Sequence, residues 1–428
     1  ARKPLHRRCL IAKRVSEANE TAIKPFRVGE EGRLAKDRLK NFLKITLGEE
    51  IFNGRTLCKY VKTIAKMHLT TDEIGSKRLL ATMEAFNAAC NEIAQTCFVQ
   101  QSASKYMIQT LVYHAIRDKY GLSAQLCIRA IAKTCEAFKL NKKVRPKFKK
   151  HGSITYDSRI LTFKGLHLPH PQVSITTLEG RQLFNLSICA YFAARTSRVQ
   201  GQVDLVYLDG KFFLYATCDM PEETPLEPDD VLGIDTGVKN IAVDNTGTTF
   251  SNEKVETVRK RVHKHRASLQ SKGTKSAKRR LKKVSRKESR FRTDTNHCVS
   301  KYLVAKAKDT GCAIALEDLT HINQRTVVRK KQRAERLSWA FYQLRSFITY
   351  KAKLAGVTVV LIDPRYTSQR CNKCGHTEKA NRNSQAEFCC KSCGHVDHAD
   401  CNGAKNIREK GLLSISLLAS AKQLLKVA

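Results

Sequence analysis

The sequence predicts an α+β multidomain protein. An N-terminal β-barrel carries an inserted helical module, and a C-terminal α/β core carries an inserted zinc ribbon. Three observations lead to this prediction. The 428 residues are too many for one ordinary domain. The hydrophobic period changes from helical to strand-like near residue 150. Finally, two Cys-x-x-Cys pairs lie close together in the C-terminal part.

The charge balance indicates a polyanionic partner. Lys and Arg number 78 against 39 acidic residues, so the formal net charge is +39. A compact chain with this imbalance repels itself unless a polyanion neutralises it. The chain has no apolar run long enough to span a bilayer, and its first segment, ARKPLHRRCLIAKR, lacks the apolar core of a secretory leader. Nucleic acid is therefore the favoured partner, and a basic structural protein is the alternative.

The N-terminal half is predicted to be a barrel interrupted by helices. Residues 1–60 form an extension to which we assign no chemistry. An alternating strand at 62–70 precedes three helical patterns that begin at Asp72. Short alternating segments separated by Gly and Asp then predict a small barrel that includes the first strand. The predicted boundaries are 61–71 and 146–220 for the barrel, and 72–145 for the helical module.

Three acidic residues in separate segments carry the predicted chemistry. Asp235 lies in the apolar strand VLGID, and Glu317 ends the apolar strand of CAIALEDLT. Asp400 precedes a helix predicted to begin near Asn402. An acid in a buried strand is costly unless it is paired or binds a cation. Three such carboxylates suit two Mg²⁺ ions, with Mn²⁺ as the alternative, about 3.5–4 Å apart in a phosphodiesterase.

Each acid also has an ordinary structural interpretation as a strand-end or cap residue. We apply that interpretation to Asp244, a turn residue, and to Asp318, which we expect on the opposite face of its strand from Glu317. Asp397 is the nearest rival to Asp400, but it lies nearer to the cysteines. The predicted catalytic and Mg²⁺-binding residues are thus Asp235, Glu317 and Asp400.

The clustered cysteines predict one structural Zn²⁺ ion. Cys371 and Cys374 form one Cys-x-x-Cys-Gly knuckle, and Cys390 and Cys393 form the other. Two such knuckles make a tetrahedral ribbon with four cysteine ligands, and four thiolates leave no open position for catalysis. Scattered cysteines elsewhere are interpreted as small buried hydrophobes of a reduced protein. Cys389 is interpreted as a bystander. His376 and His395 are interpreted as exposed ribbon residues, with replacement of one cysteine ligand as the alternative.

A basic helical hairpin is predicted at residues 253–300, turning at 271–273. Such a run is usually a solvated face, but here it separates two predicted catalytic segments, so its charge would line a channel for a nucleic-acid backbone. Three aromatic residues at helical spacing after the second acid are predicted to be core: Trp339, Phe341 and Phe347. The predicted nucleic-acid contacts are Lys275, Lys278, Arg279, Arg280, Lys282, Lys283, Arg286 and Lys287.

The order of motifs resembles the TnpB family of transposon-encoded RNA-guided nucleases, which are related to the compact type V CRISPR effectors. The motifs are GIDTGVKNIAV, IALEDL, YTSQRCNKCG, QAEFCCKSCG and ADCNGAKNI. They cover about 231–410, and the match is weaker over 61–220. The departures are the N-terminal extension and the Cys389–Cys390 doublet, which leave a transposon or a CRISPR context open.

The resemblance implies a RuvC/RNase-H-like α/β nuclease core at 221–366 and 397–428, with an inserted ribbon at 367–396 that binds target nucleic acid. The barrel would be the wedge, and the helices the recognition module. The partners would be a guide RNA, from a transposon end or a CRISPR array, and target double-stranded DNA, cut after guide pairing and reading of a short adjacent motif. The location would be a prokaryotic cytoplasm, on the nucleoid when DNA is bound. The alternatives are an RNA-guided repressor that does not cut and a transposase-like strand transferase.

Overall fold

The computed structural model describes residues 60–319, 341–384 and 386–427, and the side chains of the last helix as far as residue 420. The extension at 1–59 and Trp339 lie outside the described residues. The described residues divide into two compact units, one formed by residues 60–222 and the other by the described residues from Glu223 onward. Both units combine helices with sheets, so the fold is mixed α+β as predicted.

The first unit is built on a nearly closed antiparallel sheet with the strand order β2-β6-β7-β1-β5-β4-β3. The strand expected at 62–70 is present as β1 and pairs with β7 and β5. Its apolar side chains alternate, so that Met67 and Leu69 are buried while Ile64 is exposed. The strands are β1 (Tyr60–Thr70), β2 (Ile154–Tyr156), β3 (Leu161–Lys164), β4 (Gln172–Thr177), β5 (Gly180–Ser187), β6 (Val199–Leu208) and β7 (Lys211–Pro221).

Three helices are inserted between β1 and β2 and share one hydrophobic core with the sheet. They are α4 (Glu73–Val99), α5 (Lys105–Tyr120) and α6 (Ala124–Leu140). Each begins after a side chain that accepts a hydrogen bond from a first-turn amide, namely Asp72, Ser104 and Ser123. A short helix that the alternating pattern did not predict, α7 (Ala190–Thr196), separates β5 from β6.

The second unit is built on a five-stranded sheet with the order β10-β9-β8-β11-β12. Strands β8, β9 and β10 are antiparallel neighbours, whereas β11 and β12 run parallel to β8. Parallel strands end at the same edge, so this arrangement brings the ends of β8 and β11 together. The strands are β8 (Asp230–Asp235), β9 (Asn240–Asp244), β10 (Thr249–Ser251), β11 (Cys312–Glu317) and β12 (Val359–Ile362).

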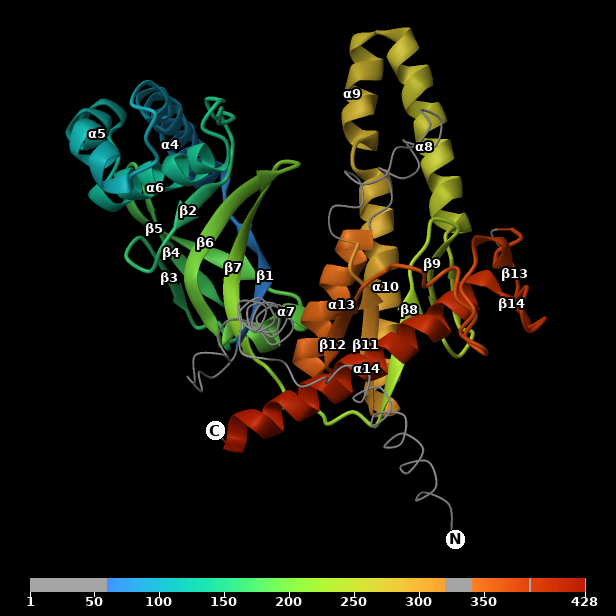
Figure 1. The fold of residues 1–428 in the computed structure, drawn as a ribbon. Coiled ribbons are helices and arrows are strands. Elements are labelled where there is room, and N and C mark those ends of the chain that lie inside the picture. Colours follow the sequence, from blue (N-terminus) through green and yellow to red (C-terminus); the bar gives the residue numbers. More distant parts are fainter. Residues whose placement is uncertain (1–59, 320–340, 385, 428) are drawn as a thin grey trace. The chain divides into compact units, whose positions relative to one another are not determined.

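Helices cover both faces of this sheet (Figure 1). On one face, α10 (Lys287–Asp309) and α13 (Phe341–Ala355) pack on apolar side chains of β8 and β11. On the other face lies α14 (Ala399–Val427). A hairpin of α8 (Glu253–Lys272) and α9 (Lys275–Val284) precedes α10. Within the described part of the chain, no helix is both long enough and apolar enough to cross a membrane.

The start of α14 corrects the prediction from the sequence. The helix begins at Ala399 rather than near Asn402, so Asp400 lies in its first turn instead of ahead of it. The cap-like Asn402 serves another purpose: its side chain accepts from the backbone N–H of Asn372 (3.0 Å) and donates to the carbonyl of Arg370 (2.8 Å). These bonds tie α14 to the segment between β12 and α14, which folds into a turn, the 3-10 helix η1 (Lys379–Asn381) and the hairpin β13 (Glu387–Cys389) and β14 (Val396–His398).

Candidate active site and metal-binding ribbon

The register of β8 and β11 places Asp235 beside Glu317. Leu316 pairs with Ile234, so the next residue on each parallel strand is an acid. Ile234 and Leu316 belong to the core under α10 and α13. Because successive side chains on a strand point to opposite faces, Asp235 and Glu317 both point to the face covered by α14.

Close packing of α14 brings Asp400 to the same place. A Cβ atom added to Gly403 would lie 2.9 Å from Oδ2 of Asp235, and one added to Gly233 of β8 would lie 2.3 Å from the carbonyl oxygen of Ala404. Two glycines therefore let the first turns of α14 lie directly on β8. The three predicted acids come together from two strands and one helix.

The pKa of Asp235 reflects the proximity of the other two acids. Burial, followed by the negative charges of Glu317 and Asp400, raises the pKa of Asp235 to about 8. Burial also raises the pKa of Glu317. All three side chains nevertheless keep some exposure to solvent, so an ion or a substrate has access to them. A site that holds carboxylates against their own repulsion is suited to a divalent cation.

The three acids are spaced more widely than the ligands of a single small ion. Among the described residues, only the four ribbon cysteines form a group of three or more possible metal ligands within 4.8 Å of one another. Carboxylates that are shared between two ions about 3.5–4 Å apart need not all converge on one point. The spacing is therefore compatible with the predicted two-ion site rather than with a one-ion cage.

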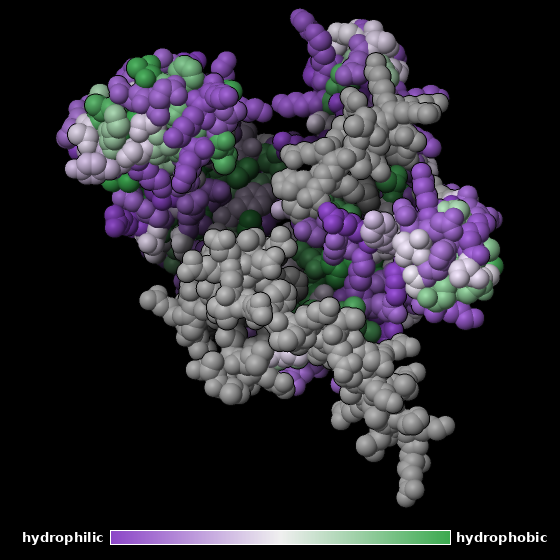
Figure 2. Space-filling model, in the orientation of Figure 1, coloured by the Kyte–Doolittle hydropathy of each residue, from purple (hydrophilic) through white to green (hydrophobic). Residues whose placement is uncertain are grey.

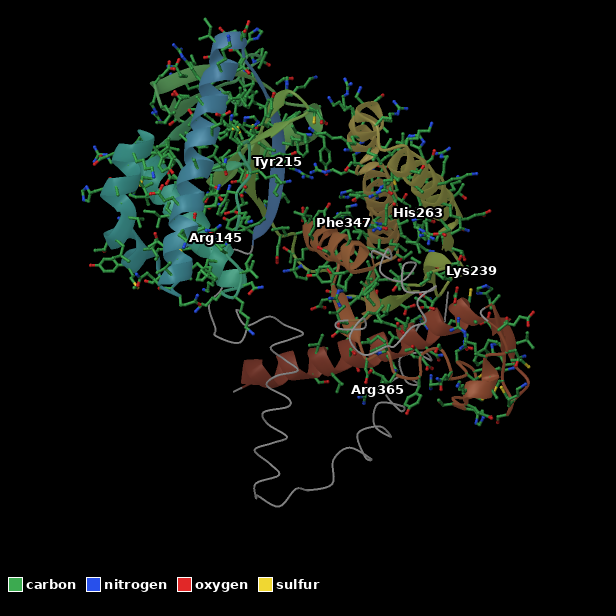
Figure 3. The ribbon with its side chains drawn as sticks, turned by 90° about the horizontal axis from the view of Figure 1, so that it is seen from above. Arg145, Tyr215, Lys239, His263, Phe347 and Arg365 are labelled. Atoms are coloured by element: carbon green, nitrogen blue, oxygen red, sulfur yellow. The ribbon has the colours of Figure 1, made fainter. Side chains whose placement is uncertain are left out.

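Neighbouring polar groups, which the sequence patterns did not reveal, orient two of the acids. Asn240 donates to Oδ2 of Asp400 (2.8 Å), and Arg382 donates to Oδ1 of the same carboxylate (3.3 Å). Thr367 donates its hydroxyl to Oε1 of Glu317 (2.5 Å). Asn240 is the first residue of β9, Thr367 lies in a turn and Arg382 lies in the inserted segment, and no hydrophobic period marks any of these positions. The exposed Lys239 precedes Asn240 on the β8–β9 turn (Figure 3).

The rival acids are used in ion pairs elsewhere. The buried Asp244 accepts from Lys306 of α10 (2.6 Å) and from the amides of Thr246 and Thr248 in its own turn. Asp318 pairs with Arg345 of α13 (2.8 Å), on the sheet face opposite to Glu317. The interpretations of Asp244 as a turn residue and of Asp318 as an opposite-face neighbour are thus confirmed. Asp397 pairs with Lys405 (2.6 Å).

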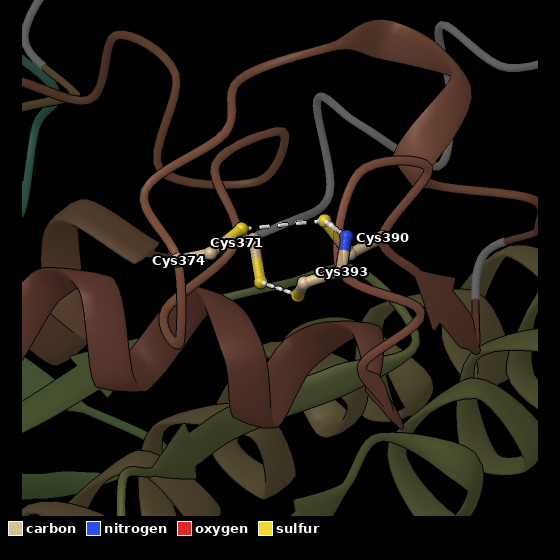
Figure 4. Close-up of side chains that lie close together, drawn as sticks. All are labelled: Cys371, Cys374, Cys390 and Cys393. Atoms are coloured by element: carbon tan, nitrogen blue, oxygen red, sulfur yellow. Dashed lines mark hydrogen bonds between the residues drawn. The ribbon is translucent and has the colours of Figure 1, made fainter.

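The four predicted zinc ligands converge in the inserted segment (Figure 4). The Sγ atoms of Cys371 and Cys393 are 3.8 Å apart, and those of Cys374 and Cys390 are 3.6 Å apart. Four sulfur atoms at these separations form the ligand set of a tetrahedral thiophilic ion. Cys389, His376 and His395 are not part of this group; His376 pairs with Glu378 (3.1 Å).

The two knuckles have the same backbone geometry, which explains the glycine after each pair. The amide of Gly375 donates to the carbonyl of Cys371 (2.9 Å), and that of Gly394 donates to Cys390 (3.0 Å). Both glycines have a positive φ, +81° and +68°, which other residues adopt only with strain. The amide of Cys393 donates to Sγ of Cys390 and lowers the pKa of that thiol to about 6, which favours the thiolate form that metals bind.

The predicted nucleic-acid residues lie on an exposed hairpin. The turn falls where it was expected, because α8 ends at Lys272 and Gly273 has a left-handed φ of +61°. All eight predicted basic side chains are exposed, either on α9 or at its junction with α10, and hydrophilic side chains project from this hairpin (Figure 2). The second arm breaks at Arg286, whose φ is +68°, before α10 continues into the core.

The aromatic residues predicted to be core are only partly buried where they are described. Phe341 and Phe347 of α13 have intermediate exposure. Phe347 stacks on His297 of α10, with ring centroids 3.9 Å apart. Phe347 therefore contributes to the contact between α13 and α10 and is not fully buried in the core.

Comparisons with known proteins find two matches, which together extend from the end of the first unit into α14. Residues 215–327 match the family model described as a probable transposase, and residues 341–407 match that of the Cas12f1-like TNB domain. The second match contains all four ribbon cysteines and Asp400, and the first contains Asp235 and Glu317.

Three curated relatives extend these matches. The CRISPR-associated endodeoxyribonuclease Cas12f1 of Syntrophomonas palmitatica is 33% identical over 234 residues, covering 50% of this chain and 46% of that protein. InsQ of Escherichia coli strain K12, described as a candidate RNA-guided DNA endonuclease, is 29% identical over 319 residues, covering 69% and 76%. A TnpB-like protein of Methanocaldococcus jannaschii is 32% identical over 163 residues, covering 35% and 59%. The chain spans about half the length of its Cas12f1 relatives.

A solved structure supports the fold along the chain. The Cas12f1 chain of a Cas12f1–sgRNA–target DNA complex superimposes with a TM-score of 0.55 at 14% identity, covering 90% of this chain and 97% of that one. At this identity the likeness shows the fold alone.

Proposed function

Because the chain belongs to the TnpB family, which is related to the type V effectors, we propose that it is an RNA-guided DNA endonuclease. The proposed activity is hydrolysis of target DNA in a single RuvC-like site after guide pairing and recognition of a short adjacent motif. The names of Cas12f1 and InsQ support this activity. The proposed partners are a guide RNA and double-stranded target DNA.

The observation that carries the proposal is the convergence of Asp235, Glu317 and Asp400. These acids lie far apart in the chain, yet the charges of the other two add to burial in raising the pKa of Asp235. Neighbouring carboxylates that are partly buried repel one another, and this arrangement costs stability unless a bound cation offsets the repulsion. We propose that all three are catalytic Mg²⁺ ligands, with Mn²⁺ as a substitute.

Each part of the site has a role in this mechanism. The bound divalent ions would supply an activated water and stabilise the leaving oxygen of the phosphodiester. Asp235 and Glu317, on rigid strand ends, would set the ligand positions, and Thr367 would hold Glu317 in one rotamer. Arg382 and Asn240 would fix Asp400 until ions and substrate arrive.

The ribbon and the hairpin would bind rather than cut. We propose that the four cysteines hold one structural Zn²⁺ ion, because their thiol groups leave no open coordination position. The exposed lysines and arginines of α9 would neutralise the phosphates of a bound strand. The first unit would act as wedge and recognition module for guide RNA and for the target-adjacent motif.

Cleavage by the reconstituted ribonucleoprotein tests the proposal. The protein is purified with its RNA and incubated with matching target DNA and Mg²⁺. We expect cleavage by the wild type and loss of cleavage in Asp235→Ala. Asp318→Asn is the matched control, because this acid follows β11 but points to the other face, and it should keep cleavage. Target DNA that is bound but uncut would favour a repressor. Strand-transfer products that survive RNase treatment before assembly would favour a transposase.

A further inference from the structure

One tyrosine beside the carboxylates has a backbone conformation that its residue type disfavours. Tyr366 has a φ of +64°. Left-handed backbone is uncommon for residues other than glycine, asparagine and aspartate, and it is a true outlier for bulky side chains. Such strain persists only where the surroundings impose it, and it gathers at functional sites.

The turn that contains Tyr366 is fixed on both sides to the candidate active site. Thr367, the next residue, bonds to Glu317 and also to the carbonyl of Pro364 (2.9 Å). Lys410 of α14 donates to the carbonyls of Asp363 (2.9 Å) and Arg365 (2.6 Å). The turn therefore cannot relax without releasing Glu317 or α14.

The ring of Tyr366 takes no part in these contacts. The residue is 62% exposed, and within the described parts of the chain no hydrogen bond, ring contact or cation contact involves its side chain. The neighbouring Arg365 is also exposed, on the same turn, where its guanidinium group pairs with the exposed carboxylate of Asp363 at 3.9 Å (Figure 3). An aromatic ring and a guanidinium group are thus presented to solvent next to the residue that orients Glu317.

The geometry points to Tyr366 as a stacking contact for a base of the DNA strand that enters the carboxylate site. This inference rests on the proposed nuclease function and names one residue that touches its substrate. A base offers a flat face to an aromatic ring in any sequence, and the neighbouring Arg365 suits the phosphate that follows the base. A flexible glycine would relieve the strain of the turn but would provide no ring.

Three substitutions separate stacking from a structural role. Tyr366→Ala removes the ring, Tyr366→Phe keeps it, and Tyr366→Gly removes both the ring and the strain. Tyr342→Ala, on α13, is the matched control, because Tyr342 is 68% exposed in ordinary helical backbone and its helix has no proposed binding role. The probe is a single-stranded target oligodeoxynucleotide with 2-aminopurine at successive positions. It is bound to the ribonucleoprotein in Ca²⁺ so that binding is read without cleavage.

We expect the emission of one probe position to be quenched in the wild type, in Tyr366→Phe and in the Tyr342→Ala control. In Tyr366→Ala the emission at that position should recover. With Mg²⁺, Tyr366→Ala should raise KM and lower kcat/KM by about 5- to 150-fold, the range of one lost base–aromatic stack. Tyr366→Gly should lose the same activity but melt at a higher temperature than the wild type.

Two results would overturn the inference. One is quenching that survives in Tyr366→Ala, and the other is a Tyr366→Phe variant as weak as Tyr366→Ala. The failure of the proposed function looks different: quenching at one position without any cleavage by the wild type would remove the nuclease and leave the stacking contact standing.

Discussion

The carboxyl group of Asp235 keeps its proton at a pH where an ordinary aspartate is ionised, because burial and two neighbouring acids oppose its charge. In the unfolded chain this group would ionise near pH 4. Between about pH 4 and pH 8 the folded protein therefore binds more protons than the unfolded chain does, and its stability from this group falls as the pH rises. A divalent cation reverses the effect by stabilising the ionised form.

We expect the melting temperature in EDTA to fall by a few degrees between pH 5 and pH 8. Asp235→Asn should flatten this fall, because the amide has no proton to lose. Thermal scans of both proteins across this range measure the difference, and Mg²⁺ should raise the wild-type value at pH 8. Parallel curves for the two proteins would contradict the assignment of the fall to Asp235.

Arg382 is expected to influence the pKa of Asp235 as well. Its guanidinium group lowers the pKa of Asp235 and bonds to Asp400, so Arg382→Gln should raise the pKa of Asp235 further and move the pH profile of cleavage upward. Arg382→Lys keeps the charge and should restore much of the profile. If the midpoint of the pH profile of cleavage is unchanged in Arg382→Gln, this residue has only a structural role.

At this scale the sequence predicted the acids but not their partners. An acid that follows an apolar strand stands out, which is why Asp235 and Glu317 could be singled out. Asn240, Thr367 and Arg382 lie at a strand start, in a turn and after a short 3-10 helix, where polar residues are ordinary. Their hydrogen bonds therefore emerge only once the chain is folded.

Among the elements, α14 connects the two halves of the site. It covers one face of the sheet, supplies Asp400 and bonds through Asn402 and Asn406 to the start of the ribbon. The sequence predicted this helix but not its first residue, because Asn402 resembles a helix N-cap more closely than the residues around Ala399 do. The starts of β1 and α4 were predictable, because the alternating pattern and the cap-like Asp72 mark them in the sequence itself.

The two glycines beneath α14 should respond differently to an added methyl group. In Gly233→Ala the Cβ meets the backbone of α14, which cannot yield, so we expect a loss of about 1–3 kcal/mol of unfolding free energy. In Gly403→Ala the Cβ meets only the carboxylate of Asp235, and the helix gains in propensity. That variant should keep its stability in denaturant titrations yet lose cleavage. Equal losses of stability in the two variants would contradict this distinction.

The ribbon is expected to need bound Zn²⁺ to keep its fold. Cys374→Ser and Cys390→Ser are each expected to lose one Zn²⁺ per chain by elemental analysis, to lower the melting temperature and to reduce cleavage, because Arg382 lies in the ribbon. Cys389→Ser is the matched control and should retain the metal. A full zinc content in Cys390→Ser would mean that another side chain completes the site.

For the whole molecule, composition alone predicted the class of partner, since a net charge of +39 needs a polyanion. It could not show which charges face that polyanion. The eight hairpin residues could be named because they form one dense run, whereas the remaining basic residues are spread over both units and carry no positional signal.

Removing four of the hairpin charges should weaken nucleic-acid binding in a salt-dependent manner. In the variant with Lys278, Arg279, Lys282 and Lys283 changed to Gln, the slope of log Kd against log salt should fall by about 0.9 for each lost phosphate contact. Exchange of Lys and Arg at the same four positions keeps the charge and should keep the slope. An unchanged slope in the Gln variant would place the phosphate contacts elsewhere.

Burial of one whole sheet face beneath α14 has a consequence for synthesis of the chain. Val231, Ala313 and Ala315 are covered by this helix, which begins about 80 residues after Glu317. A ribosome that adds about 5–20 residues each second leaves that face uncovered for several seconds. During this interval the apolar face of the nascent sheet is exposed and prone to aggregation, and Asp400 has not yet joined the other two acids. The candidate active site is therefore completed only when this hydrophobic surface is covered.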